Sequence, residues 1–315
     1  RAARRLAMLA RDYDLLFANT QKALLIAGLA GWWANRPVVW NLHDLLTTDH
    51  FTWLNRWGAV QAANRFATHV IANSRASQAA FRRAGGRVPS SVVYNGIDPA
   101  PFTSVTEAER TARRAEFGVG SAPLLGVFSR LAAWKGQHVL LEALSALPTA
   151  HVLLVGEALF DGDQPYASTL REQAAALGLQ DRVHFAGFRT DVPALMAACD
   201  VVVHTSVAPE PFGRVIVEGM LASRPVVATR AGGALEIIDD GHTGCLVPPD
   251  NASALAATLA PLLDDPARRR ALGQQGREYA QRAFSPEQMR AGVEAVLQGA
   301  HANSRTAHQT VGRSA

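Results

Sequence analysis

The chain alternates short apolar runs rich in β-branched residues with segments of helical periodicity, and this alternation is the strongest constraint on its fold. Such runs, spaced by helices, are typical of parallel sheets that helices cover on both faces. Four candidate strands precede residue 103, at 14–19, 37–44, 69–74 and 91–96. Six more follow, at 123–129, 151–156, 183–188, 200–206, 225–230 and 244–248. The sequence therefore predicts an α/β protein with two parallel sheets.

A polar, proline-containing stretch, IDPAPFTSVTEAERTARRAEFGVG, separates the two sets of strands. Because domain boundaries fall in such stretches, we predict an N-terminal domain at 1–103 and a C-terminal domain at 104–283. We expect the helical segment 284–300 to pack back on the N-terminal domain. The final segment, 301–315, has few apolar residues and no periodicity, which predicts a disordered tail.

The first set of strands is short for a doubly wound domain, which normally opens on a strand followed by a glycine-rich turn. This sequence opens within a basic helical pattern instead, RAARRLAMLAR. We therefore expect the first domain to lack its N-terminal βαβ units in this sequence.

Composition and charge narrow the class of protein. Hydrophobic residues make up 48% of the chain and charged residues 18%, as in globular domains. The longest apolar run, ALLIAGLAGWWA, is shorter than the roughly 20 residues that a bilayer crossing needs. No secretory leader pattern is recognisable, so we expect a cytoplasmic protein, whose basic start allows peripheral contact with the inner face of the membrane. The net charge of +4 comes from scattered basic residues, which argues against nucleic acid as a partner.

The stretch PEPFGRVIVEGM places two carboxylates, Glu210 and Glu218, after a predicted strand. Glu218 falls in an apolar helical pattern that starts near Gly213, where an unpaired carboxylate would cost several kcal/mol or take up a proton. It therefore needs donors. A basic side chain could supply them, and so could the hydroxyl groups of a sugar or ribose at the carboxyl ends of the strands, where α/β folds bind ligands.

Together with SRLAAWKG upstream, these residues resemble the retaining glycosyltransferases of family four, the glycosyl transferases group 1. Further stretches match in register: VFSRLAAWKGQHVLLEAL, VHFAGFRTDVPALMAACDVVVHTS, ANSRASQAAFRRAG and VVYNGID. The resemblance covers roughly 14–300 and implies the GT-B fold, with two Rossmann-like domains facing a cleft. It implies transfer of a sugar, with retention, from a nucleotide-sugar donor to a glycan, lipid or small-molecule acceptor. The alternative is a nucleotide-sugar binding module, catalytically impaired because its first domain is short.

The resemblance also assigns roles by position. Arg130 and Lys135 would hold the donor diphosphate, and cations after a strand end suit the charge that develops on a departing nucleoside diphosphate. Glu218 would accept hydrogen bonds from the ribose. The donor sugar and phosphates would face Glu210 and the backbone amides of Phe212, Gly213 and Arg214.

Other residues border this predicted site. Phe188 and Arg189 would lie beside the base, and the glycines of RAGGALEII, Gly232 and Gly233, form either a loop near the donor or a simple strand-to-helix turn. In the first domain, His43 follows a strand and would lie near the transferred sugar, although a lone histidine is often structural. The predicted catalytic residues are thus His43, Arg130, Lys135 and Glu210.

No metal or other cofactor is expected, since the nucleotide-sugar is a co-substrate. The segment DGDQ at 161–164 imitates an Asp-x-Asp metal site of another glycosyltransferase fold, but aspartate and glycine are also the usual residues of an exposed turn. Cys199 and Cys245 lie among apolar residues without metal-ligand spacing, which predicts buried free thiols. The sequence leaves the oligomeric state open.

Overall fold

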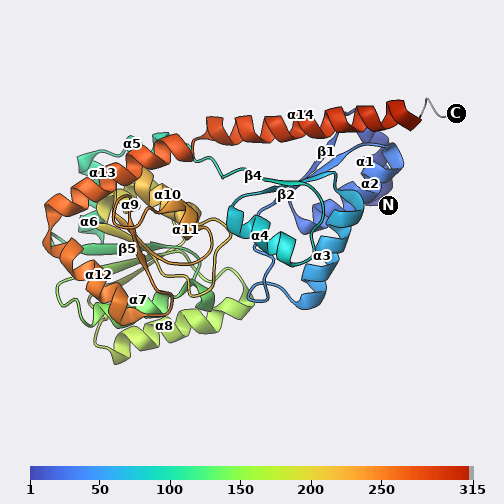
Figure 1. The fold of residues 1–315 in the computed structure, drawn as a ribbon. Helices are drawn as coiled ribbons and strands as arrows, with labels where there is room; N and C mark the ends of the chain where they lie inside the picture. The colour runs from blue at the N-terminus through green and yellow to red at the C-terminus, as the bar shows by residue number, and fades with distance from the viewer. Residues whose placement is uncertain (312–315) are drawn as a thin grey trace. The chain divides into compact units, whose positions relative to one another are not determined.

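A computed structural model of the chain describes the backbone of residues 1–311 and the side chains of residues 1–302. The chain forms two compact units (Figure 1). Unit 1 contains Arg1–Gly96 and the chain from Pro286 onward, and unit 2 contains Ile97–Ser285. The predicted boundaries, 103/104 and 283/284, lie seven residues after the first of these boundaries and two residues before the second.

Unit 1 is built on a four-stranded parallel sheet in the order β1-β2-β3-β4. The strands are β1 (Leu16–Ala18), β2 (Val38–Leu42), β3 (His69–Ala72) and β4 (Ser90–Val92). Its helices are α1 (Ala2–Ala10), α2 (Gln21–Ala34), α3 (Trp53–Phe66), α4 (Arg75–Arg83) and α14 (Pro286–Val311). Trp40 and Phe81 meet edge-on in the core of this unit.

The last helix, α14, contains most of the segment 284–300. Its residues Val293, Val296 and Ala300 pack on Val39 and Ile71 of the unit 1 sheet. Residues 301–311, for which the sequence predicts a disordered tail, continue helix α14 to Val311; residues 312–315 lie outside the described residues. Once packing has formed the first turns of a helix, each further residue adds a hydrogen bond without a new nucleation cost. A tail without an apolar stripe can therefore stay helical.

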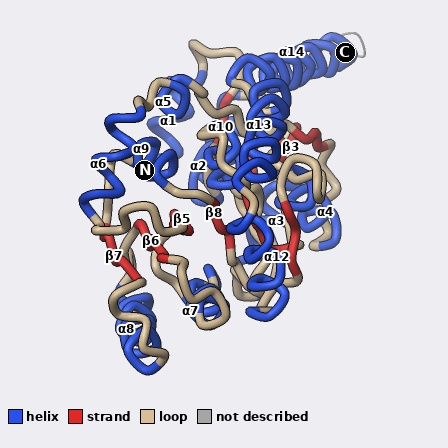
Figure 2. Tube along the Cα trace, turned by 90° about the vertical axis from the view of Figure 1, so that its left-hand side faces the viewer, coloured by secondary structure: helices blue, strands red, loops and turns tan. Residues whose placement is uncertain are grey.

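Unit 2 is built on a six-stranded parallel sheet in the order β10-β9-β8-β5-β6-β7. The strands are β5 (Leu124–Phe128), β6 (His151–Val155), β7 (Val183–Gly187), β8 (Val201–His204), β9 (Val226–Thr229) and β10 (Cys245–Val247). Figure 2 shows β7, β6, β5 and β8 side by side in this order. Along the chain, β6 and β7 are added on one side of β5, and β8, β9 and β10 are then added on its other side. The strand order thus reverses between β5 and β8.

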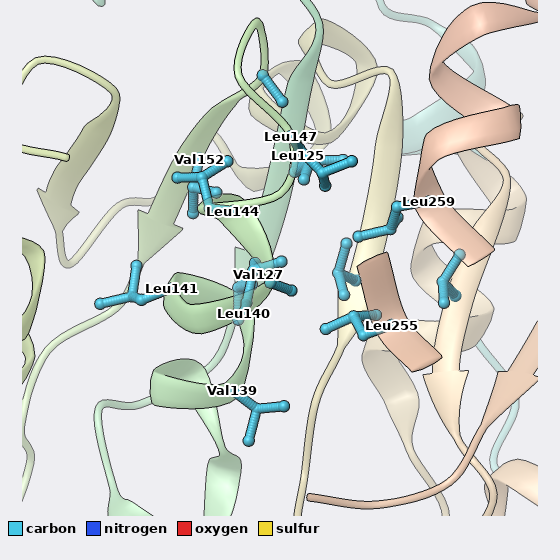
Figure 3. Close-up of a cluster of buried hydrophobic side chains, with 14 of the residues drawn as sticks. Leu125, Val127, Val139, Leu140, Leu141, Leu144, Leu147, Val152, Leu255 and Leu259 are labelled. Carbon is cyan, nitrogen blue, oxygen red and sulfur yellow. The ribbon is translucent and has the colours of Figure 1, made fainter. Parts of the chain in front are cut away.

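Helices cover both faces of the unit 2 sheet. They are α5 (Ala100–Thr103), α6 (Glu107–Glu116), α7 (Gln137–Leu144), α8 (Gln164–Ala176), α9 (Val192–Ala198), α10 (Arg214–Leu221), α11 (Ala234–Ile237), α12 (Ala252–Asp264) and α13 (Pro266–Ala283), with 3-10 turns η1 (Ala133–Lys135) and η2 (Asp161–Asp163). On one face, Leu125 and Val127 of β5 pack with Leu140 of α7 and Leu255 of α12 (Figure 3). On the other, Leu124 and Leu153 pack with Leu195 of α9.

The ten predicted strands and the α/β class are confirmed, and both cysteines are buried and free as predicted. Successive residues of a buried parallel strand are apolar on both sides, which explains why the continuous runs identified the strands. Within residues 1–311, none of the helices has both the length and the apolar character needed to cross a bilayer.

Candidate active site

The predicted donor-side residues meet where the strand order of unit 2 reverses. Open α/β sheets bind ligands at such a point, beyond the carboxyl ends of the strands. Arg130 and Lys135 follow β5, and Glu210 follows the neighbouring strand β8. A cavity of about 440 Å³ lies here, and its lining residues are Phe128, Ser129, Arg130, Trp134, Lys135, Glu210, Arg214, Val215 and Glu218. A second, of about 240 Å³, shares Phe128, Ser129, Arg130 and Glu218 with it and also contacts Phe188 and Arg189.

Glu210 is the buried carboxylate of this site. Its Oε1 accepts hydrogen bonds from Lys135 Nζ at 2.5 Å, from His204 Nε2 at 2.8 Å and from Ser206 Oγ at 2.5 Å. Burial by itself would raise the pKa of Glu210, but the charge and hydrogen bonds of His204 and Lys135 outweigh it and hold this pKa below its ordinary value. Glu210 is therefore ionised and fixed in orientation.

Close backbone packing holds the Lys135 and Glu210 loops together. Gly136 has φ = 67°, and a Cβ at this position would lie 2.1 Å from the carbonyl oxygen of Thr205. Thr205 Oγ1 in turn donates to the carbonyl oxygen of Lys135 at 2.9 Å. Gly232 has φ = 57°, and a Cβ there would lie 2.2 Å from the carbonyl oxygen of Glu210. The RAGG segment therefore packs directly against the backbone of the Glu210 loop. A simple strand-to-helix turn would not need this close contact.

Arg130 is held by aromatic rings and by one carboxylate. Its guanidinium lies 4.9 Å from the ring centre of Phe160 and 5.5 Å from that of Trp134, and its Nη1 lies 3.8 Å from Asp163 Oδ2. Asp163 belongs to the DGDQ segment, which therefore contributes a carboxylate beside Arg130. Among the described residues, no three His, Cys, Asp or Glu side chains come close enough together to hold a metal ion.

Glu218 differs from its prediction. Its side chain is 19% exposed and lines both cavities, and its Oε1 accepts a 3.3 Å hydrogen bond from Arg214, whose side chain is 65% exposed. The expectation of an apolar helix enclosing Glu218 is wrong, because Arg214, Val215 and Glu218 form an open face of α10. A basic neighbour supplies one donor, and the cavity beside it leaves room for others.

The remaining predicted donor residues have distinct environments. Phe188 is 67% exposed, whereas the Arg189 guanidinium makes two 2.8 Å hydrogen bonds to Asp191 and further bonds to Glu116, which raise the pKa of Arg189. Phe212 is buried against Phe284. The side chain of Arg189 therefore fixes its own loop, and Phe188 is the exposed group of the pair.

The start of α10 has the geometry that the sequence predicts. Gly213 is the N-cap with φ = 100°, and the helix begins at Arg214. No side-chain hydrogen bond caps this helix. Since Arg214 and Val215 line the larger cavity, the positive end of the α10 dipole lies beside it.

His43 belongs to unit 1 and follows β2. Its Nε2 accepts a 2.9 Å hydrogen bond from Asn41 Nδ2, which also donates to Asn19 Oδ1 at 3.0 Å. Asn73 Nδ2 donates to the His43 carbonyl oxygen at 3.4 Å. Partial burial lowers the pKa of His43, against the opposing charge of Asp44, so the ring is neutral at pH 7.

Sequence reasoning missed several residues of the site. Asn19 and Asn41 sit at strand ends of unit 1, and His204 and Ser206 at the end of β8. The available signal was a polar residue closing an apolar run, as in VVVHTS. That pattern does not show that His204 and Ser206 bind Glu210.

Two parallel-sheet domains with paired cations and carboxylates at a switch point define a protein of the GT-B fold class. Known proteins agree. The family model for glycosyl transferases group 1 matches residues 109–279, and that for glycosyltransferase family 4 matches residues 1–101. The chain therefore belongs to the glycosyl transferases group 1.

Individual relatives support this assignment. Crystal structures of Anabaena Alr3699/HepE, in complex with UDP or with UDP-glucose, are 43% identical, with a TM-score of 0.90 over 94% of this chain and 82% of that chain. A GDP-mannose-dependent phosphatidylinositol monomannoside mannosyltransferase of Corynebacterium glutamicum is 30% identical over 91% of this chain and 77% of its own length. The chain spans between 47% and 59% of the length of four other curated relatives.

Proposed function

We propose that the protein transfers a hexose from a nucleotide-sugar donor to an acceptor, and that the donor binds in unit 2. The observation that carries this proposal is the Lys135–Glu210 ion pair beside Arg130 at the switch point of the sheet. A solved relative with 43% identity binds UDP-glucose, which makes a UDP-sugar the first donor to test.

The cations and carboxylates divide the work. Arg130 and Lys135 offset the charge of the diphosphate, most strongly as it leaves, and the N-terminal end of α10 adds a fixed positive dipole. Glu210 accepts hydrogen bonds from sugar hydroxyl groups, and Glu218 accepts them from the ribose. Phe188 offers an exposed ring beside the base. These groups need no metal ion, and the donor is a co-substrate rather than a cofactor.

We further propose transfer with retention of configuration. Three donors hold the Glu210 carboxylate and its pKa is low, so it is a weak nucleophile and serves to orient the sugar. The bond from the anomeric carbon to the diphosphate oxygen breaks first through an oxocarbenium-like state. The acceptor oxygen then bonds to the anomeric carbon on the same face, and its proton passes to the departing phosphate. Neutral His43, a proposed catalytic residue, hydrogen-bonds the sugar in transit.

Exposed apolar side chains on two helices of unit 1 support an acceptor at a membrane. Helices α2 and α3 expose the large apolar side chains Leu25, Ile26, Leu29, Trp32, Trp33, Trp53, Leu54 and Trp57. Neither helix contains Asp or Glu, and both carry basic residues, Lys22, Arg56 and Arg65. Exposed tryptophan and leucine with basic neighbours suit the interface of an anionic bilayer. We propose peripheral contact of a cytoplasmic protein with such a surface, which favours a lipid-linked acceptor.

Measuring turnover distinguishes the proposed transferase from the alternative, a nucleotide-sugar binding module without activity. The purified chain is given UDP-glucose or GDP-mannose with and without a lipid-linked acceptor, and nucleoside diphosphate release is measured beside a thermal shift. A ligand at a hundred times its Kd stabilises the folded state by about 2.7 kcal/mol, which is easily seen. Release that depends on acceptor supports the transferase, and stabilisation without release supports the module.

Vesicle sedimentation tests the membrane contact. The chain should pellet with phosphatidylglycerol vesicles, and Trp53→Ser with Trp57→Ser should reduce the bound fraction severalfold, whereas Trp134→Ser of unit 2 should not. Equal sedimentation of the two variants would contradict the proposed surface.

A further inference from the structure

A second charged cavity lies at the opposite edge of the unit 2 sheet. It has a volume of about 400 Å³, and its lining residues are Arg110, Asp200, Ser223, Arg224, Pro225, Pro266, Arg269, Arg270 and Gln274. Asp200 and Pro225 come directly before β8 and β9, so this cavity opens at the amino ends of the strands. The candidate active site lies beyond their carboxyl ends.

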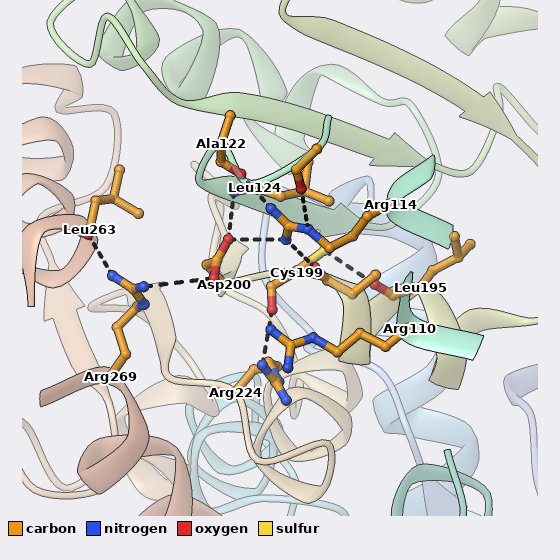
Figure 4. Close-up of polar contacts among 12 residues, drawn as sticks. Arg110, Arg114, Ala122, Leu124, Leu195, Cys199, Asp200, Arg224, Leu263 and Arg269 are labelled. Atoms are coloured by element: carbon orange, nitrogen blue, oxygen red, sulfur yellow. Dashed lines mark hydrogen bonds and ion pairs between the residues drawn. The ribbon is translucent and has the colours of Figure 1, made fainter. Parts of the chain in front are cut away.

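The lining carries four arginines and a single carboxylate, and that carboxylate is already engaged (Figure 4). Asp200 Oδ2 accepts hydrogen bonds from the Leu124 amide at 2.9 Å and from Arg114 Nη1 at 3.2 Å. Its Oδ1 lies 3.8 Å from Arg269 Nη2. Asp200 therefore has little capacity left to balance the other arginines of the cavity.

Two of the arginines in this region have clear structural roles. Arg114, outside the cavity lining, donates to the Ala198 carbonyl oxygen at 2.7 Å. Arg269 Nη1 donates to the carbonyl oxygens of Leu262 and Leu263, at 2.7 and 2.5 Å, and so closes the end of α12. These contacts account for both side chains without a ligand.

The contacts of Arg110 and Arg224 within the protein are weaker and do not account for the position of either side chain. Figure 4 shows their guanidinium groups beside each other. The Nη1 of Arg224 makes a long 3.4 Å hydrogen bond to the Cys199 carbonyl oxygen, and its Nε donates to Ala222 at 3.2 Å. Arg110 Nη1 lies 3.4 Å from Glu107, whose side chain is 77% exposed, and the buried Arg110 Nε has no hydrogen-bond partner among the described residues.

The electrostatics of Arg224 agree with this geometry. Burial lowers the pKa of Arg224, and the positive charge of Arg110 lowers it further. Two like charges thus share a partly desolvated cavity, where an anion between them would be stabilised by both.

We propose that this cavity binds a small phosphorylated anion, either a free diphosphate or a phosphate monoester. Guanidinium groups present planar pairs of N–H donors that match phosphate oxygens. Arg110, Arg224 and Arg270 supply these donors, and all three side chains line the cavity. The cavity lies at the amino ends of β8 and β9 and the candidate active site beyond their carboxyl ends, so the two anion sites are distinct.

Calorimetric titration of the full chain with inorganic pyrophosphate tests the proposal. Arg224→Gln and Arg270→Gln are compared with Arg268→Gln, an exposed arginine of the same helix outside the cavity lining. Any pyrophosphate bound at the active site contributes equally to all three variants. We expect Arg224→Gln and Arg270→Gln each to weaken one class of sites about tenfold, and Arg268→Gln to match the wild type.

Binding that is equally tight in Arg270→Gln and Arg268→Gln would overturn the proposal. The exposed Arg270 decides the test even where Arg224→Gln impairs folding, which circular dichroism would show. A parallel titration with a hexose phosphate distinguishes the sources of phosphate. Tighter variant-sensitive binding than that of pyrophosphate indicates a phosphorylated sugar, and weaker binding indicates a free diphosphate.

Discussion

The carboxyl ends of the two sheets carry different chemistry. In unit 2, Lys135 and Glu210 place opposite full charges in contact, with Arg130 beside them. In unit 1, Asn19, Asn41 and neutral His43 form a hydrogen-bonded group whose polar atoms carry no net charge. Fixed charges suit a diphosphate, and neutral donors and acceptors suit sugar hydroxyl groups. Substitutions at the two edges should therefore differ in how strongly they reduce activity.

Lys135→Met should have the largest effect. Lys22 and Lys135 are the two lysines among 31 basic residues, so a lysine where this chain otherwise uses arginine indicates a need for a compact ammonium. We expect kcat/KM for the nucleotide-sugar to fall about a thousandfold, the range seen when a group that stabilises transition-state charge is lost. Nucleoside diphosphate release measures it, and Lys22→Met with a soluble acceptor is the control. Full activity in Lys135→Arg would contradict the argument about size.

Gly232→Ala tests whether backbone packing positions the charged edge. The new Cβ would lie 2.2 Å from the Glu210 carbonyl oxygen, at φ = 57°. Gly118 is the matched control, because its φ is 63° and nothing lies within 4 Å of a Cβ there. We expect Gly118→Ala to cost about 1 kcal/mol of unfolding free energy and Gly232→Ala to cost about 1–3 kcal/mol more, measured by urea unfolding. Equal costs would show that the close approach is unimportant.

His43→Gln should have a smaller effect, since it replaces one neutral hydrogen-bonding group by another. The pKa of His43 is below 6.5, so the ring stays neutral above that pH. We expect kcat/KM to fall about tenfold, with the same pH dependence between pH 7 and 8 in both proteins. A pH–rate profile checks this. Loss of a titration in that range on substitution would contradict a neutral role.

Acid stability gives the smallest expected difference. The pKa of Glu210 is lower in the folded state than its ordinary 4.5, so its ionised form stabilises the fold above pH 4.5. This contribution is lost as the pH falls below 4.5 toward the folded-state pKa. The wild type should therefore lose more unfolding free energy between pH 6 and pH 3 than Glu210→Gln, by about 1 kcal/mol or more. Exposed Glu172→Gln should behave as the wild type; an identical pH dependence in Glu210→Gln would refute the assignment.

Several features of the site could be predicted and others could not. The family resemblance assigned Arg130, Lys135 and Glu210 to the site. Their places after strands agree with it, because parallel strands bring their carboxyl ends to one edge of the sheet. The environment of Glu218 was misjudged because its spacing alone did not show that Arg214, Val215 and Glu218 share an open face. The role of Asp163 was missed because a turn motif does not say which neighbour it meets, here Arg130 at 3.8 Å.

The sequence alone determined the ten strands and their division into two sheets, because continuous apolar runs between helical segments are typical of buried parallel strands and a polar, proline-containing stretch separates the two sets. The tertiary structure decided which carboxylate is buried: strand order sets β8 beside β5 and brings Glu210 to Lys135, 75 positions earlier in the chain. It also gathered the arginines at the opposite edge. Burial and charge pairing depend on neighbours in space, and side chains so distant in sequence become neighbours only when the sheet forms.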